Sequence, residues 1–110
     1  MEKSELVVMG AASPCFSVSV TDSASSAAAC GASQNNFLRV VNAGASNAFI
    51  ALGGASVAAT VPTGTAATTS TPVLAGSDNI FSVDSTHTHI SAICATGLTA
   101  TLYVQRCGGV

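Results

Sequence analysis

The chain is 110 residues long, which is enough for one domain with a single modest core. Only 7% of its residues are charged and its net charge is −2, whereas roughly 25% of the residues in an ordinary soluble domain are charged. These values exclude the basic surface of a nucleic-acid-binding protein and the basic runs that bind anionic lipid. No apolar run approaches the roughly 20 residues that span a bilayer.

Residues 1–13 are predicted to form an arm, and residues 14–110 a single domain. The arm begins with charged residues, and its apolar patch is too short for a signal peptide with a cleavage site. We therefore expect the protein to be made and kept in a cytosol. Within the arm, Leu6, Val7 and Val8 are expected to add a strand to a neighbouring subunit.

The domain begins with an alternating strand at residues 16–20. The next stretch, residues 21–33, is rich in Ser and Ala. A short helix ending near Ala29 and a loop with one weak strand near residues 28–30 are both consistent with this composition.

The strongest local pattern covers residues 35–53, which predict two strands and a connecting loop. Arg39 lies on the face opposite Leu38 and Val40, because side chains alternate along a strand. The loop at residues 42–47 is rich in Asn, Gly and Ser, which favour turns. The pattern predicts a β-hairpin.

Residues 54–76 have low sequence complexity. They predict a strand over residues 56–61 and an exposed loop or edge over residues 66–70. Because Pro72 cannot donate to a hydrogen-bond ladder, residues 71–76 are expected at a sheet edge or a strand start.

Further strands are predicted at residues 80–83, 89–95 and 98–105. A tight turn at residues 96–97 is expected to join the last two strands into a second hairpin, followed by a Gly-containing tail at residues 106–110. The total is about eight short strands with frequent turns, which is typical of an antiparallel β-sandwich or barrel. No helix of useful length interrupts them, so the chain is predicted to be all-β.

The four cysteines have no close-spaced pair, which argues against a zinc site made of all four. A cytosolic origin argues against disulfides, although pairing of Cys15 with Cys30 remains open. Cys94 is expected inside an apolar strand as a small hydrophobic residue.

Candidate chemistry is confined to His87 and His89. Residues two apart on a strand face the same way, so both rings could meet one metal, with Asp84 as an oxygen ligand. Two histidines do not complete a site, and an exposed or subunit-facing pair is the better-supported interpretation. A pH-sensitive contact is a second option. We predict no resident metal and no cofactor.

Catalytic motifs are missing from the sequence. No GxSxG elbow, GxGxxG pattern or P-loop occurs, and we expect that the protein is not an enzyme. Arg39 is one of only three basic residues, and its scarcity suggests a partner in the core or at an interface. Asp78 and Asp84 are the candidates for that partner.

Several runs resemble small virion proteins of tailed bacteriophages: FLRVVNAGASNAFIALG, VAATV, TPVLAGSDNIFSV and HISAICATGLTATLYVQRCGG. They cover residues 37–109. The resemblance implies a jelly-roll-like antiparallel β-sandwich with no catalytic residues.

The resemblance further implies a capsid decoration (cement) protein, a homotrimer bound to the major capsid protein on the outside of the head shell. Its location would be the virion, assembled in the host cytoplasm. The residues expected to serve assembly are Leu6, Val7, Val8 and Arg39. Alternatives are a neck, tail or fibre component, or a small β module that binds metal or carbohydrate.

Overall fold

The computed structural model describes residues 7–8, 15–30, 37–63, 65 and 68–109. These ranges contain nine strands and no helix, so none of them includes a helix able to cross a membrane. The strands are β1 (Val7–Val8), β2 (Phe16–Val20), β3 (Ala28–Ala29), β4 (Phe37–Asn42), β5 (Ala48–Gly53), β6 (Thr71–Val73), β7 (Asp78–Ser82), β8 (His89–Cys94) and β9 (Ala100–Gly109).

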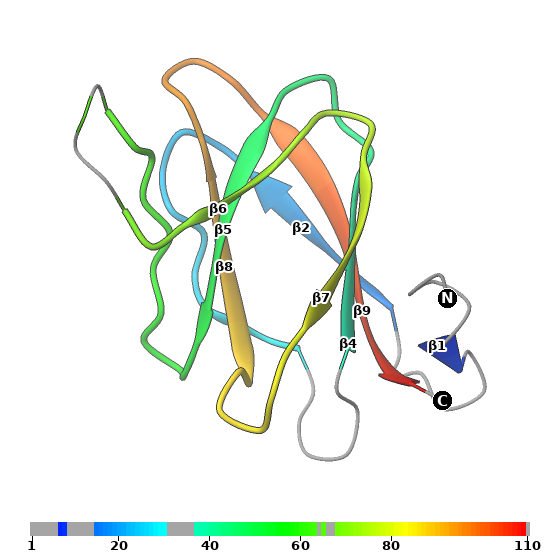
Figure 1. Cartoon of the computed structure of the whole chain (residues 1–110). Coiled ribbons are helices and arrows are strands. Elements are labelled where there is room, and N and C mark those ends of the chain that lie inside the picture. The colour runs from blue at the N-terminus through cyan, green and yellow to red at the C-terminus, as the bar shows by residue number, and fades with distance from the viewer. Residues whose placement is uncertain (1–6, 9–14, 31–36, 64, 66–67, 110) are drawn as a thin grey trace.

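Two antiparallel sheets face each other as the layers of a sandwich (Figure 1). The first sheet has the order β2-β9-β4-β7, and β1 pairs with the far end of β9. The second sheet has the order β3-β8-β5-β6. Strands that follow each other in the chain mostly alternate between the two sheets, and this order is that of a jelly roll. The predicted all-β sandwich is therefore confirmed.

The core lies between the sheets and consists mainly of aliphatic side chains. Alternation along each strand sends every second residue inward, and Leu38, Val40, Leu102 and Val104 of the first sheet are fully buried. The second sheet contributes a matching row. The buried residues of that row are Ala48, Ile50, Val73, Ile90, Ala92 and Cys94.

Neither of the two predicted hairpins forms. β4 pairs with β7 and β9 in the first sheet, whereas β5 pairs with β6 and β8 in the second. The same holds for β8 and β9, which also lie in different sheets. The loops at residues 43–47 and 95–99 therefore cross from one sheet to the other.

Residues 21–30 form a loop that contains the short strand β3, so the helical alternative is wrong. The loop runs alongside β8 of the second sheet. Cys94 donates its backbone N–H to the carbonyl of Thr21 over 2.7 Å, and the Ser25 hydroxyl accepts from the backbone N–H of Ala92 over 2.9 Å.

The strand predicted over residues 56–61 is absent. Residues 57–62 instead run as irregular backbone against the outer face of the second sheet. Ala59 is 2% exposed, and its backbone N–H donates to the hydroxyl of buried Ser91 over 3.0 Å. A side-chain hydroxyl thus takes the place of a strand partner. The predicted exposed stretch 66–70 lies partly outside the described residues.

The ends of two other strands also differ from expectation. β7 begins at Asp78, two residues earlier than predicted, and β9 continues through the expected tail to Gly109. β6 is confirmed as an edge strand, with Pro72 at the rim of the second sheet.

Candidate functional site

One side of the first sheet presents apolar and charged side chains together. Leu38 and Val40 point into the core, so Phe37, Arg39 and Val41 of β4 point outward. Register adds Asp78 and Ile80 of β7 and Tyr103 of β9 to the same side. We call this surface the Arg39 face. Its residues are Phe37, Arg39, Val41, Asp78, Ile80 and Tyr103.

The apolar residues of the Arg39 face are only partly buried. Tyr103 is 46% exposed, and Phe37, Val41 and Ile80 are each half-buried. Tyr103 is the only tyrosine in the chain. Val41 stands directly opposite it in the β4–β9 ladder. A half-buried aliphatic row beside an exposed aromatic ring is a surface suited to contact with another protein.

Arg39 forms a two-pronged ion pair with Asp78 across the β4–β7 ladder. Its Nε donates to Oδ1 over 3.0 Å, and its Nη2 donates to Oδ2 over 2.6 Å. The hydrogen bond from Arg39 lowers the pKa of Asp78. The same bond raises the pKa of Arg39. Of the two candidate partners, Asp78 is the one that Arg39 meets, and the pair lies on the surface rather than in the core.

The folded state therefore favours the ionised carboxyl of Asp78. This contribution to stability is present above the ordinary pKa of an aspartate and is lost as the pH falls through the lowered value. The side chains of Arg39 and Asp78 are 39% and 49% exposed, so solvent screens the pair and its net contribution is small. Its main effect is to fix the orientation of both side chains on the face.

The arm residues expected to serve assembly fall only partly within the described ranges. Val7 and Val8 form β1, which pairs with Gly109 and Gly108 of the same chain. Leu6 lies outside the described residues. β1 pairs with the same edge of β9 as β2 does. There is room for both strands, because β2 pairs with β9 only as far as Val104. The arm strand thus continues the first sheet.

The two histidines make separate hydrogen bonds. His87 Nδ1 accepts from the backbone N–H of Asp84 over 3.1 Å. His89 Nδ1 lies 2.9 Å from the hydroxyl of Thr88. Among the described residues, no group of three or more His, Cys, Asp or Glu side chains is placed to hold a metal ion. Each histidine makes a hydrogen bond within the segment at residues 84–89.

Arg106 is the residue that sequence patterns missed. The sequence predicts a tail here, but Arg106 is 1% exposed and points into the sandwich at the end of β9. Its guanidinium donates to the backbone carbonyls of His87 and, over 2.7 Å, of Asp84. It therefore fastens the loop between β7 and β8. The alternation of Leu102 and Val104 continues to Arg106 and was the available signal.

Cys30 lies beside this arginine. Its thiol points toward the carbonyl of His87 at 3.8 Å. Burial raises the pKa of Cys30, and the nearby charge of Arg106 opposes that rise. All four cysteines are free: Cys15 is exposed, and Cys30, Cys94 and Cys107 are buried. The pairing of Cys15 with Cys30, which the sequence leaves open, does not occur. Cys94 is the expected small core residue.

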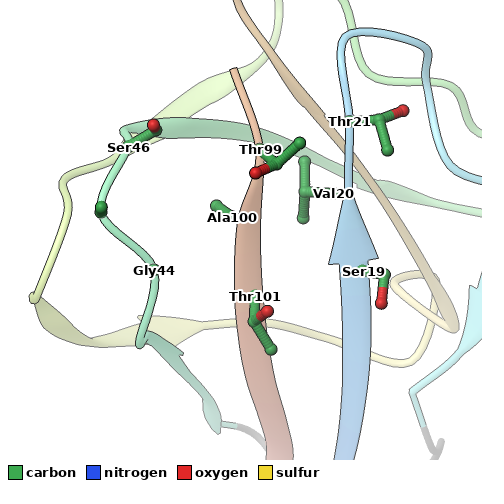
Figure 2. Close-up of a pocket in the computed structure, with 9 residues that line it drawn as sticks. Ser19, Val20, Thr21, Gly44, Ser46, Thr99, Ala100 and Thr101 are labelled. Atoms are coloured by element: carbon green, nitrogen blue, oxygen red, sulfur yellow. The ribbon is translucent and has the colours of Figure 1, made fainter. Parts of the chain in front are cut away.

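A hollow of about 380 Å³ opens at one end of the first sheet. Figure 2 shows the β4–β5 loop on one side of β9 and the end of β2 on the other. Five hydroxyl side chains line it, together with small apolar groups. The lining residues are Ser19, Val20, Thr21, Gly44, Ala45, Ser46, Thr99, Ala100 and Thr101.

Comparison with protein-family models finds no match to this chain, and comparisons with curated proteins and with solved structures find none either.

Proposed function

We propose that this protein is a structural component of a tailed-phage virion, and that it decorates the outside of the assembled head shell as an oligomer. Three observations support the proposal. The fold is a jelly roll, which is common among viral capsid proteins. The sequence resembles small phage virion proteins. The charged fraction of 7% leaves little to keep a monomer apart from its neighbours. Fold alone does not assign function.

The Arg39 face carries this proposal. Its half-buried aliphatic side chains and exposed Tyr103 make an apolar surface with one fixed ion pair at its centre. Aromatic and arginine side chains are enriched at protein interfaces. In the proposed oligomer this face is the contact between subunits, and the rest of the surface is left for the shell.

The mechanism of decoration is mass action. A protein that binds the assembled shell but not its separate subunits stabilises the shell by RT ln(1 + [L]/Kd). No catalytic step is needed. The major capsid protein is the proposed partner, and the oligomer increases avidity by presenting several copies of each contact at once.

The first test measures mass in solution by light scattering across a concentration series. We expect the native chain to form a stable oligomer, and the resemblance implies a trimer. Tyr103→Glu adds a charge to the Arg39 face and is expected to shift the population to monomer. Leu74→Glu is the matched control, because Leu74 is 58% exposed in the loop that follows β6 and is not one of the residues of this face. Monomers at all concentrations, or equal effects of both variants, would contradict the subunit contact.

The second half of the test measures co-sedimentation with empty heads and with isolated tails of the phage that encodes the protein. Binding to heads supports decoration. Binding to tails alone would replace it with the neck, tail or fibre alternative. Binding to neither would overturn a structural role on the virion surface.

A further inference from the structure

The hollow at the end of the first sheet has a defined wall, and its polar lining side chains are hydroxyls. Ser19 and Thr101 are cross-strand partners in the β2–β9 ladder, and Val20 pairs with Ala100. The β4–β5 loop closes the other side through Gly44, Ala45 and Ser46 (Figure 2). Its volume of about 380 Å³ lies within the range of small-molecule sites.

A fully buried asparagine holds the loop wall of the hollow in place. Asn42 donates from Nδ2 to the carbonyls of Ser46 over 2.9 Å and Val73 over 3.0 Å. Its Oδ1 accepts from the backbone N–H of Gly44 over 2.9 Å. The loop is also bound to β9, because Ala43 donates its N–H to the carbonyl of Thr101 over 2.9 Å. The wall therefore exists before any ligand arrives, which reduces the ordering cost of binding.

The chemistry of the lining restricts the class of ligand. Among the described residues, the polar side chains that line the hollow are all hydroxyls, those of Ser19, Thr21, Ser46, Thr99 and Thr101, and none is charged. An ionic ligand would lose hydration without meeting an opposite charge. The hydroxyl of Thr21 already bonds to the backbone of Ser23, but an apolar ligand would leave the other four hydroxyls without partners. A hydroxyl both donates and accepts, so the best match is a neutral ligand whose own groups do the same.

We propose that the hollow binds a neutral sugar unit of a glycan. Sugar hydroxyls fit the donor and acceptor pattern of the lining, and the exposed methyl group of Ala45 provides a contact for sugar C–H groups. The Arg39 face lies beyond the hollow on the same sheet, so subunit contact and sugar binding use different residues. The sugar site does not depend on the proposed place of the protein in a virion.

A single hollow of this kind binds weakly. The described residues that line it include no aromatic side chain, so they do not supply the stacking that strengthens many sugar sites. A Kd of about 1 mM corresponds to only about −4 kcal/mol. Several copies on one particle would raise the overall avidity without any new contact. Attachment to a glycan-coated surface is the use that suits such a site.

The test is a titration of the isotope-labelled protein followed by amide NMR shifts. The probes are the methyl glycosides of glucose, galactose, mannose and N-acetylglucosamine, each raised to about ten times the 1 mM reference Kd. We expect saturable shifts for at least one probe, concentrated at residues 19–21, 43–46 and 99–101. Thr101→Val keeps the shape of the side chain but removes its hydroxyl, and is expected to weaken that binding at least fivefold.

Thr71→Val is the matched control, because Thr71 is an exposed strand residue of β6 outside the hollow. It is expected to bind the probe as the native chain does. The proposal is overturned if no probe gives saturable shifts in these segments, or if Thr101→Val and Thr71→Val bind equally well. Far-UV circular dichroism of both variants checks that they are folded. Head binding is measured separately, so either proposal can fail alone.

Discussion

Two arginines on neighbouring strands show how one step in register decides the environment of a residue. Arg39 of β4 stands opposite Gln105 of β9, and Leu38 stands opposite Arg106. Alternation places Arg39 with the outward residues and Arg106 with the inward ones. The first makes an exposed ion pair, and the second is buried and donates to backbone carbonyls.

Replacing the two arginines by methionine should separate these roles. Arg106→Met removes the guanidinium donor from the carbonyls of Asp84 and His87, which keep only the backbone N–H of His87 and the weak thiol donor of Cys30. The expected cost is about 1–3 kcal/mol in total. Arg39→Met removes only an exposed pair and should cost at most about 1 kcal/mol. Urea unfolding of both variants measures the difference. Equal losses would mean that Arg106 does not support the β7–β8 loop.

Gly44 tests the closeness of the β4–β5 loop to β9. A Cβ at this position would lie 2.7 Å from the Cα of Ala100, closer than real side chains approach. Gly44→Ala is therefore expected to lower the free energy of unfolding by about 1–3 kcal/mol, as overpacking does. Gly54→Ala is the control, because its Cβ would meet nothing within 4 Å. If Gly44→Ala lowers the free energy of unfolding by less than about 0.5 kcal/mol, the loop moves freely.

At the scale of single elements, the sequence predicted which side chains are buried better than it predicted which strands pair. The inward rows of β4, β8 and β9 follow directly from their alternation. Alternation does not identify the hydrogen-bond partner, because both strands of a hairpin and both strands of an inter-sheet connection face the same core. The two predicted hairpins failed for this reason.

The irregular segment at residues 57–62 is the other element that the sequence misassigned. Its Ala and Val residues resemble a strand, but the decisive contact comes from Ser91, more than thirty positions later. Ser91 Oγ accepts from the backbone N–H of Ala59 and donates to the carbonyl of Ser25 over 2.8 Å. One hydroxyl thus connects three separate parts of the chain, and no local pattern contains that information.

Ser91→Ala should release this segment from the second sheet. The buried N–H of Ala59 loses its acceptor, which is expected to cost about 1–3 kcal/mol. Amide hydrogen exchange at Ala59 and Thr60 should accelerate more than exchange in β4. Ser82→Ala, at an exposed position of β7, is the control and should change neither quantity. Unchanged exchange at Ala59 in Ser91→Ala would show that apolar contact alone holds the segment.

At the scale of the whole molecule, the candidate surfaces were predictable to different degrees. The pairing of Arg39 with Asp78 followed from the scarcity of charge and is confirmed. The hollow was not predicted, because its lining comes from three stretches that only the jelly-roll order brings together. Arg106 was within reach of the same alternation argument that located Leu102 and Val104, but two following glycines suggested a tail.

The position of β9 has a consequence for biosynthesis. This strand, residues 100–109, pairs with β1, β2 and β4, all of which leave the ribosome before it. Until β9 is made, β2 and β4 have no strand between them and the first sheet cannot close. Contacts between such distant parts of a chain form slowly. The nascent polypeptide is therefore expected to stay unfolded, and open to chaperones, until translation has passed residue 109.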